Sequence, residues 1–275
     1  MTMNFKSLAL PGIQNLMPYQ GGKAAEEVER ELGISDVVKL CSNENPSGAS
    51  LIAKSAIINV LDDIARYPDS NGYHLKQKLA EKLSVKSSQL TLGNGSNDLL
   101  ELVAKSFLGS NHSAVFSQHA FLVYKLAIAA QNAKSINVPA KNWGHVLQTM
   151  SEAIEDDTRL IFIANPNNPT GTYLRKSELQ ELHKKLPSKV LLLIDDAYTE
   201  YMQQKDYASG LDLFKNAKNV LVTRTFSKIY GLASLRLGWG YASKNVISAL
   251  TNVKPPFNIT TGSETAGVAA LQDVK

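Results

Sequence analysis

The sequence holds a single cysteine, Cys41, among its 275 residues. One cysteine cannot form a disulfide within the chain, which excludes a secreted scaffold held together by cross-links. Cys41 lies in the stretch "VVKLCSN". We interpret it as a small buried residue at the end of a strand, with a catalytic thiol as the alternative.

Long apolar runs are missing as well. No stretch reaches the roughly 18 consecutive apolar residues that a membrane-spanning helix needs. The N-terminal "MTMNFKSLALPGIQ" lacks the apolar core of a signal peptide. We therefore expect no association with a membrane and a cytoplasmic location.

Blocks of charge and paired metal ligands are also absent from the sequence. The formal net charge is +4, and the basic residues are spread through helical stretches such as "HLKQKLAEKL". This distribution predicts no nucleic-acid partner, although it permits a mildly basic pocket for an anionic small molecule. The five histidines show no HExxH or other paired spacing, so we predict no metal site.

What the sequence does contain is an alternation of short apolar runs and amphipathic segments. Strands are predicted at 37–42, 113–118, 135–139, 160–164, 190–195, 219–225 and 237–242, and helices at 75–83, 97–108 and 176–186. Nearly continuous apolar strands that alternate with helices are typical of an α/β fold, with a mostly parallel sheet covered by helices.

The chain is predicted to have three regions. Residues 1–40 contain the charged helix "GKAAEEVERELGI", and we expect them to form an arm that contributes to a smaller domain. Residues 41–250 are predicted to form the large, ligand-binding α/β domain. Residues 251–275 are predicted to start a helix that leads to a C-terminal part of the smaller domain, which we expect this chain to lack.

Ligands of open α/β sheets bind beyond the carboxyl ends of the strands, and several unusual stretches fall at such positions. In "TLGNGSNDLLEL" (91–102), two glycines allow a tight turn, and Ser96 and Asn97 then open a helix. The N–H groups at such a helix start suit a phosphate, although a glycine-rich helix start is also a common structural device. The stretch matches neither the GxGxxG dinucleotide loop nor the P-loop.

Two further stretches combine strand ends with polar side chains. In "FIANPNNPTGTY" (162–173), Asn168 precedes a proline and is an oriented hydrogen-bond donor, or simply part of a rigid turn. In "LLLIDDAYTEY" (191–201), Asp195 closes an apolar strand, where burial raises its pKa unless a cation stabilises it. Tyr198 can reach the same pocket. The alternative is that Asp195 caps a helix.

The fourth stretch, "TRTFSK" (223–228), places Lys228 beside the hydroxyls of Thr225 and Ser227, with Arg236 eight residues further on. A solvated loop lysine is the simplest interpretation. The four stretches together indicate more, because they supply what pyridoxal phosphate requires. An aldehyde can bond the lysine, a ring nitrogen can pair with the aspartate, a phenolic oxygen can take the asparagine and tyrosine donors, and a phosphate can bind the arginine.

These stretches, with others along the chain, resemble histidinol-phosphate aminotransferases, a family of fold-type I enzymes that depend on pyridoxal phosphate. The matching segments are "LMPYQGGK", "KLCSNENPSG", "RYPDSNGYHLKQKLA", "GNGSNDLLEL", "NPNNPTGTY", "IDDAYTEY" and "TRTFSKIYGLASLRLGW". They cover almost the whole chain. "NNPTG" and the lysine with its later arginine occur in many class I and II aminotransferases, whereas "NENPxG" and "RYPD" point to the histidinol-phosphate branch.

The resemblance assigns a role to each matching residue. It makes Lys228 the Schiff-base lysine and proton carrier, pairs Asp195 with the pyridinium nitrogen, and places Asn168 and Tyr198 at the phenolic oxygen. It assigns phosphate binding to Ser96, Asn97, Thr225, Ser227 and Arg236. It assigns ring stacking to Phe121, where the family usually has tyrosine, and substrate binding to Tyr19 and Asn43.

The resemblance also implies a homodimer, because Tyr67 matches a tyrosine that reaches the phosphate of the neighbouring subunit's cofactor. Three departures from the family pattern stand out. "DDAY" replaces the commoner "DEAY" at Asp196, which we expect to be a mild change, and "ENPSGAS" replaces versions like "ENPLGPS". The third is the expected absence of the C-terminal part, which carries the arginine that holds the substrate's α-carboxylate.

The implied reaction is transamination of L-histidinol phosphate with 2-oxoglutarate, giving imidazole-acetol phosphate and L-glutamate, in histidine biosynthesis. The expected partners are therefore a phosphorylated amine or amino acid and a 2-oxo acid. Two alternatives stay open from the sequence. One is a pyridoxal-phosphate decarboxylase of a phosphorylated amino acid, and the other is a truncated cofactor-binding protein without full activity.

Overall fold

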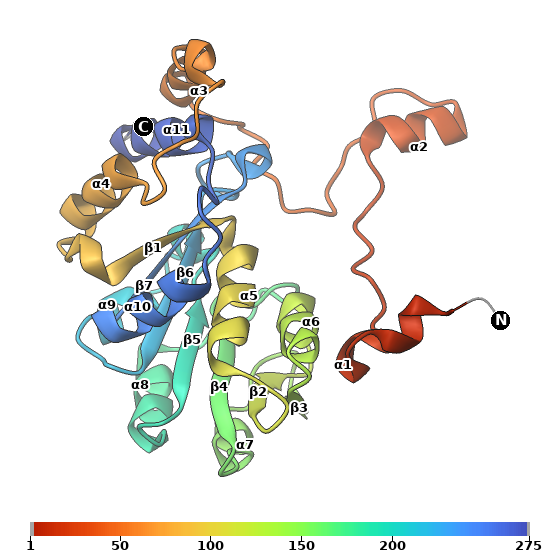
Figure 1. Ribbon diagram of the computed structural model, residues 1–275, viewed down its shortest axis with the longest axis vertical. Coiled ribbons are helices and arrows are strands. Elements are labelled where there is room, and N and C mark those ends of the chain that lie inside the picture. The colour runs from red at the N-terminus through yellow and green to blue at the C-terminus, as the bar shows by residue number, and fades with distance from the viewer. Residues whose placement is uncertain (1–2, 274–275) are drawn as a thin grey trace.

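A computed structural model of the protein describes residues 3–273, which form a seven-stranded sheet in the order β1-β7-β6-β5-β4-β2-β3 (Figure 1). The strands are Leu90–Asn94 (β1), Ser113–Ser117 (β2), Lys134–Val138 (β3), Thr158–Ala164 (β4), Leu191–Asp195 (β5), Val220–Thr225 (β6) and Leu237–Ala242 (β7). Strands β2 to β6 pair in parallel, and β7 runs antiparallel to both of its neighbours. The predicted mostly parallel sheet is therefore confirmed.

Helices surround the sheet. They are Pro11–Gln14 (α1), Ala25–Leu32 (α2), Leu51–Ile58 (α3), Tyr73–Leu83 (α4), Ser96–Phe107 (α5), Leu122–Ala130 (α6), Leu147–Glu152 (α7), Lys176–Lys185 (α8), Gly210–Phe214 (α9), Lys244–Val253 (α10) and Thr261–Gln272 (α11). Short 3-10 turns occur at Phe5–Leu8 (η1), Leu61–Asp63 (η2), Ser87–Gln89 (η3), Thr199–Tyr201 (η4) and Ala233–Leu235 (η5). The helices predicted at 75–83, 97–108 and 176–186 correspond to α4, α5 and α8, the charged N-terminal helix corresponds to α2, and the helix predicted to start within 251–275 corresponds to α11.

The central strands are apolar because they are covered on both faces. Along β5, Leu191 and Leu193 pack with α5, α6 and α10, whereas Leu192 and Ile194 pack on the opposite face with α7, α8 and α9. A strand alternates its side chains between faces, so burial on both sides requires an apolar residue at every position. The same alternation decides the direction of the polar residues at the strand ends.

A third apolar cluster covers the β1–β7 edge of the sheet. Helices α3, α4 and α11 pack against one another there, and Figure 1 shows them together at one end of the molecule. Leu75 of α4 and Leu237 of β7 are completely buried in this cluster. Helix α11 thus has a packed position on α3 and α4, while the predicted boundaries of the three regions stay a prediction.

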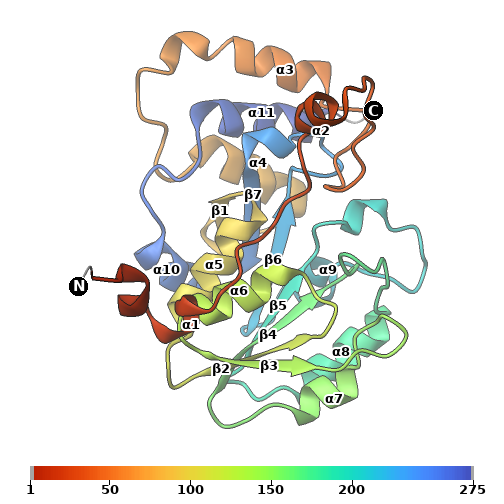
Figure 2. The same ribbon diagram turned by 90° about the vertical axis from the view of Figure 1, so that its right-hand side faces the viewer.

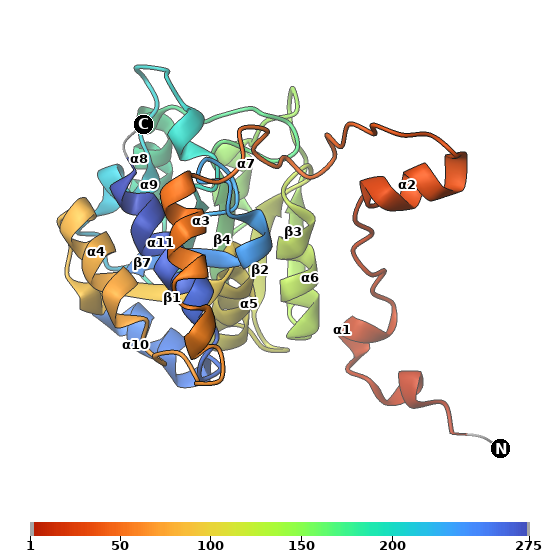
Figure 3. The same ribbon diagram turned by 90° about the horizontal axis from the view of Figure 1, so that it is seen from above.

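The N-terminal segment runs outside this body. Figures 2 and 3 show α1 near α6, and Figure 3 shows α2 standing away from the sheet and its helices. The backbone N–H of Gly12 in α1 donates to Asn132 Oδ1 just after α6, at 3.0 Å. Helix α2 has no buried residue. The segment then returns along 35–50 to the carboxyl ends of the strands.

Two expectations about strands were wrong. The stretch 37–42 forms no strand, its Val38 and Leu40 are exposed, and Cys41 is an exposed free thiol. Conversely, β1 was not predicted, because its Gly93 and the following Gly95 indicated a loop. Within residues 3–273, no helix combines the length and the apolar character needed to cross a bilayer.

Candidate active site

One cavity of about 540 Å³ lies beyond the carboxyl ends of β4, β5 and β6 and at the start of α5. Its size suits a cofactor or a small ligand. All of the predicted site residues except Tyr67 line it: Tyr19, Asn43, Ser96, Asn97, Phe121, Asn168, Asp195, Tyr198, Thr225, Ser227, Lys228 and Arg236. Segments separated by up to about 200 residues of sequence therefore meet in one place.

Asp195 lies at the bottom of the cavity with a side chain that is almost fully buried. Thr223 Oγ1 donates to its Oδ1 and Tyr124 Oη donates to its Oδ2, each at 3.0 Å. Burial raises the pKa of Asp195, and these two hydrogen bonds act in the opposite direction. A carboxyl held in this way is suited to face a cation inside the cavity.

Lys228 follows β6 and is half-buried in the cavity wall. Its Nζ donates to the carbonyl oxygen of Ser42 at 2.9 Å and lies 5.6 Å from the centre of the Tyr198 ring. Burial lowers the pKa of Lys228, nearby Arg236 lowers it further, and Glu44 raises it. A lowered pKa leaves more of the amine neutral, which makes it a better nucleophile and base.

The other end of the cavity is built for an anion. Helix α5 begins there, and Arg236 Nη1 donates to Ser227 Oγ at 3.3 Å. Gly95, with φ of 81°, precedes the helix, and a Cβ on it would collide with the Arg236 guanidinium. A positive charge, a hydroxyl and free helix N–H groups thus converge, the donor set that a phosphate prefers.

The walls between these ends are aromatic and amide-rich. The Phe121 ring contacts the Tyr124 ring edge-on, with 5.9 Å between centroids, and Tyr124 stacks on Phe162 at 4.9 Å. Asn168 lies in the turn after β4, on the cavity surface. Asn43 Nδ2 donates to Tyr198 Oη at 3.0 Å, which brings the N-terminal segment into the cavity wall.

Tyr67 lies elsewhere. Its side chain is 83% exposed and stacks on Phe257 with 4.8 Å between ring centroids. It lines a separate hollow with Arg66, His74 and Glu264, among others. Within one chain, therefore, Tyr67 does not contribute to the cavity that contains Lys228.

Comparison with known proteins identifies this arrangement. Residues 35–275 match the model of the aminotransferase class I and II family. Histidinol-phosphate aminotransferase 2 of Pseudomonas fluorescens is 50% identical over all of this chain and 75% of its own length. Its namesake from Haemophilus influenzae is 46% identical over 98% of this chain and 74% of its own length. The chain belongs to the class I and II aminotransferases, in the histidinol-phosphate aminotransferase branch.

A solved structure supports the same family. Histidinol-phosphate aminotransferase from Sinorhizobium meliloti, in complex with pyridoxal-5′-phosphate, superposes with a TM-score of 0.88 at 27% identity. The match covers 96% of this chain and 70% of that one. The predicted family, fold class and cofactor are therefore confirmed, and pyridoxal phosphate is the cofactor of this aminotransferase.

The cavity fits that cofactor by its chemistry. It offers an amine of lowered pKa, a buried carboxyl, and an anion cradle in which glycine backbone approaches the arginine. These three features are what an aldehyde, a ring nitrogen and a phosphate need. The role of each side chain toward the cofactor stays a prediction.

Three contacting residues were missed from the sequence. Tyr124 and Thr223 bond Asp195, and Ser42 holds Lys228 through its carbonyl oxygen. Thr223 had a usable signal, because it stands two residues before Thr225 in a strand and must face the same side. Tyr124 and Ser42 had none, since a helix and a loop from elsewhere in the chain deliver them.

Asp196, the departure from "DEAY", is completely buried. Its Oδ2 accepts from the Gly210 N–H at 2.7 Å and lies 3.9 Å from Arg224 Nε. The pKa of Asp196 is raised to about 8, chiefly by burial and in smaller part by Asp195 and Glu200, while Arg224 and the Gly210 hydrogen bond act in the opposite direction. The expectation that this departure is mild stays a prediction.

We predict that Gly238→Ala weakens cofactor binding. A Cβ at Gly238 would lie 2.5 Å from the Gly95 carbonyl carbon and the Ser96 nitrogen, so the start of α5 must move. Affinity for pyridoxal phosphate should fall by about tenfold, which corresponds to roughly 1.4 kcal/mol. Affinity for pyridoxal, which has no phosphate, should change less. Fluorescence titration of the apoprotein measures both.

Gly109→Ala is the matched control, because its nearest neighbour to an added Cβ is 3.8 Å away and its φ is ordinary. Equal losses for pyridoxal and pyridoxal phosphate in Gly238→Ala would contradict an anion cradle at this position.

Asp196→Asn should change how stability depends on pH. The folded pKa of Asp196 lies above its ordinary value of 3.8, so the folded chain holds this proton more tightly. Its contribution to stability is therefore present below about pH 4 and is lost as the pH rises toward about 8. Relative to the asparagine variant, the wild type should lose stability across this window, as urea unfolding at pH 5 and pH 8 can measure. Parallel stability curves would show that this carboxyl does not titrate there.

Proposed function

We propose that this aminotransferase transfers the amino group of L-histidinol phosphate to 2-oxoglutarate, giving imidazole-acetol phosphate and L-glutamate, in histidine biosynthesis. The proposal is supported by the names of the relatives taken together with the residues of the cavity. Relatives of up to 50% identity over the whole chain are named for histidinol phosphate, and one cavity holds the lysine, aspartate and arginine that the chemistry requires.

Lys228 has the central role in this proposal. Pyridoxal phosphate, when bound, supplies an aldehyde that bonds amines and a ring that withdraws electrons from the carbon beside them. Lys228 Nζ would hold the cofactor through that aldehyde, and the same amine would take the proton from the substrate carbon that bears the nitrogen. The lowered pKa of Lys228 favours both tasks because the neutral amine is the reactive form.

Asp195 keeps the ring nitrogen protonated by facing it as a carboxylate. Thr223 and Tyr124 donate to its two oxygens, which opposes the rise in pKa that burial causes and fixes the orientation of the carboxyl group. Phe121 covers one side of the ring, and the Phe121–Tyr124 contact links that cover to the carboxylate. Asn168 and Tyr198 donate to the phenolic oxygen.

Arg236, Ser227 and Thr225 hold the phosphate together with the α5 N-terminus, at which Ser96 and Asn97 lie. Fixing this charged end orients the aldehyde toward Lys228. Tyr19 and Asn43 bring the N-terminal segment to the open side of the cavity, where a substrate enters. We propose that they contact the substrate.

We further propose that the enzyme acts as a homodimer. Tyr67 is exposed and outside the chain's own cavity, as expected for a residue that serves the cavity of a second copy. Large apolar side chains on the N-terminal segment and α3 are also exposed, and a subunit interface would cover them. They include Phe5, Met17, Leu40, Leu51 and Ile58. The cytoplasmic location and the three-region division stay predictions.

The proposed reaction is tested by following its products. Wild-type enzyme with histidinol phosphate and 2-oxoglutarate should form L-glutamate, and borohydride reduction should fix the cofactor's mass on Lys228. Lys228→Ala should carry no such mass and should lose about 10²–10⁴-fold in kcat. Lys244→Ala, a change of an exposed lysine on α10, should behave as wild type.

The alternatives give different results in the same assays. Carbon dioxide released from a phosphorylated amino acid, without glutamate formation, would favour a decarboxylase. Cofactor fixed on Lys228 without either product would favour a cofactor-binding protein without full activity. Absence of the mass from wild type would overturn the assignment of Lys228.

Tyr67 gives a test of the dimer. Sedimentation should give twice the chain mass of 30.0 kDa. Tyr67→Phe should weaken binding of pyridoxal phosphate by about tenfold, the effect of a lost hydrogen bond to a charged group, while sparing the dimer. Tyr73→Phe, a change of another exposed tyrosine, is the control. A monomeric protein whose affinity for pyridoxal phosphate is unchanged in Tyr67→Phe would refute the shared site.

A further inference from the structure

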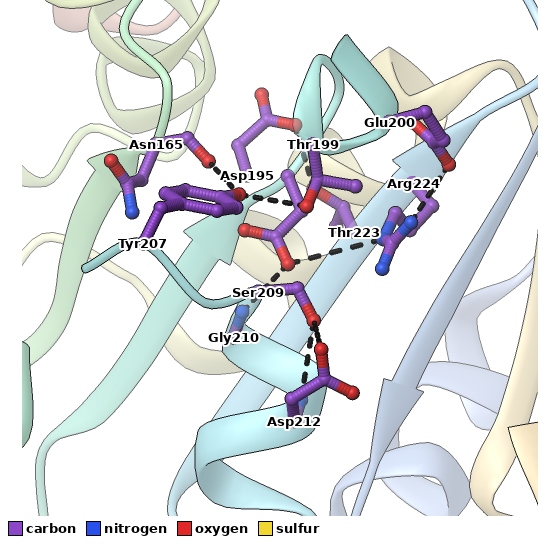
Figure 4. Close-up of polar contacts among 11 residues, drawn as sticks. Asn165, Asp195, Thr199, Glu200, Tyr207, Ser209, Gly210, Asp212, Thr223 and Arg224 are labelled. Carbon is purple, nitrogen blue, oxygen red and sulfur yellow. Dashed lines mark hydrogen bonds and ion pairs between the residues drawn. The ribbon is translucent and has the colours of Figure 1, made fainter. Parts of the chain in front are cut away.

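Behind the cavity, on the opposite face of the sheet, a second set of charged residues is buried. Arg224 of β6 has a side chain only 13% exposed, and its Nη1 lies 2.7 Å from Glu200 Oε1 (Figure 4). Its Nε lies 3.9 Å from Asp196 Oδ2. None of the three lines the cofactor cavity. The proposed reaction uses none of them directly.

The pairing of β5 with β6 explains why they meet. Asp195 pairs with Thr223, and their side chains are hydrogen-bonded on the face of the sheet toward the cavity. Since strand neighbours point to opposite faces, Arg224 faces the rear, and so does Asp196 just after β5. The Asp196 N–H continues the ladder by donating to the Thr223 carbonyl oxygen at 3.0 Å. The Asp195–Thr223 pair at the front of the sheet thus has the Asp196–Arg224 pair behind it.

Glu200 extends this rear contact to the turn that carries Tyr198. It belongs to η4, Thr199–Tyr201, two residues after Tyr198. Tyr207 Oη reinforces the turn, because it donates to the Asn165 carbonyl oxygen at 3.0 Å and is hydrogen-bonded to Thr199 Oγ1 at 2.7 Å (Figure 4). Asn165 begins the loop that carries Asn168. The two segments predicted to bind the phenolic oxygen are therefore held from the same rear face.

Arg224 is itself well anchored. Its guanidinium lies over the Trp239 ring of β7, 5.6 Å from the centroid. It therefore joins β6, β7 and η4. By contrast, the front of Tyr198 has one hydrogen bond, which comes from Asn43 in the N-terminal segment. The backbone between β5 and α9 contains no strand, so the rear contacts fix where Tyr198 stands.

A contribution to stability alone is a weak explanation for these charges. Burying an ion pair costs desolvation that its attraction barely offsets, and apolar residues of similar volume often serve better. Arg224 Nε and Asp196 Oδ1 even lack hydrogen-bond partners within the described residues. A rigid, directional contact is what an arginine offers here and an apolar residue does not.

We propose that Arg224 and Glu200 form a positioning pair that fixes the Tyr198 hydroxyl from behind the sheet. The inference rests on the proposed function, in which that hydroxyl donates to the phenolic oxygen of the cofactor. Loss of the pair would let Tyr198 drift and would weaken that donation. A donor to an anionic oxygen stabilises negative charge, so its loss makes the bound cofactor keep its proton to higher pH.

The test is the pH midpoint of the visible absorbance band of the bound cofactor. Glu200→Ala should raise this midpoint, in the direction of Tyr198→Phe and by up to about one pH unit, the scale of one hydrogen bond to a charged group. In a Tyr198→Phe background, Glu200→Ala should cause no further shift. Glu200→Gln, which keeps an acceptor for Arg224, should restore most of the wild-type midpoint.

Glu155→Ala is the matched control, because it breaks an exposed ion pair with Lys134, far from η4 in the sequence. The melting temperature of each apoprotein separates misfolding from misplacement. An unchanged midpoint in Glu200→Ala, or an equal shift with and without the Tyr198 hydroxyl, would overturn the inference. A wild type without a Lys228-dependent band would instead overturn the proposed function on which it rests.

Discussion

The parallel pairing of β5 with β6 is the constraint on which the rest of the site depends. It sets Asp195 beside Thr223 on one face and Asp196 beside Arg224 on the other. A slip of one residue in the register of these strands would exchange the side chains on the two faces of the sheet and place Arg224 on the cavity side. Such a slip would also exchange the side chains that pack into the two cores, so both cores would have to repack. The packing of the sheet therefore also sets the orientation of the side chains in the site.

Burial is what gives these polar groups distinct chemistry. Lys228, Asp195 and Asp196 all have shifted pKa values, and burial is the first cause of each shift. The partners then decide what the shift means. Lys228 has a backbone carbonyl as partner and can lose its proton, whereas Asp195 has two hydroxyl donors and can keep its charge. Burial thus lowers the pKa of Lys228 and raises that of Asp195, and the hydrogen-bond donors of Asp195 oppose the rise.

The sequence predicted the central strands well because burial on both faces imposes an unmistakable composition. The prediction from composition was wrong in two places, one strand that was missed and one stretch that is not a strand. Strand β1 carries glycines that resemble a loop, and 37–42 carries valines and a leucine but forms no strand. Local composition records propensity, whereas a strand also requires a neighbour. That information lies elsewhere in the chain.

The site followed a similar rule. Residues at strand ends could be gathered from the sequence because parallel strands finish at one edge of the sheet. Tyr124 could not, since the contact with Asp195 depends on how α6 is rotated against the sheet. The rear charges were equally hidden, because Arg224 and Glu200 are close only once η4 has folded back over β6. Sequence reasoning thus finds the donors along the edge and misses the groups that hold them.

The N-terminal segment closes the cavity across a very long stretch of chain. The Lys228–Ser42 contact spans 186 residues, and the Asn43–Tyr198 contact spans 155. Contacts of such separation are entropically costly to form before the intervening chain has collapsed. Closing this wall of the pocket therefore requires two distant segments of the chain to come together. During synthesis Ser42 leaves the ribosome long before Lys228. In that interval the N-terminal segment lacks the residue that it contacts in the finished pocket.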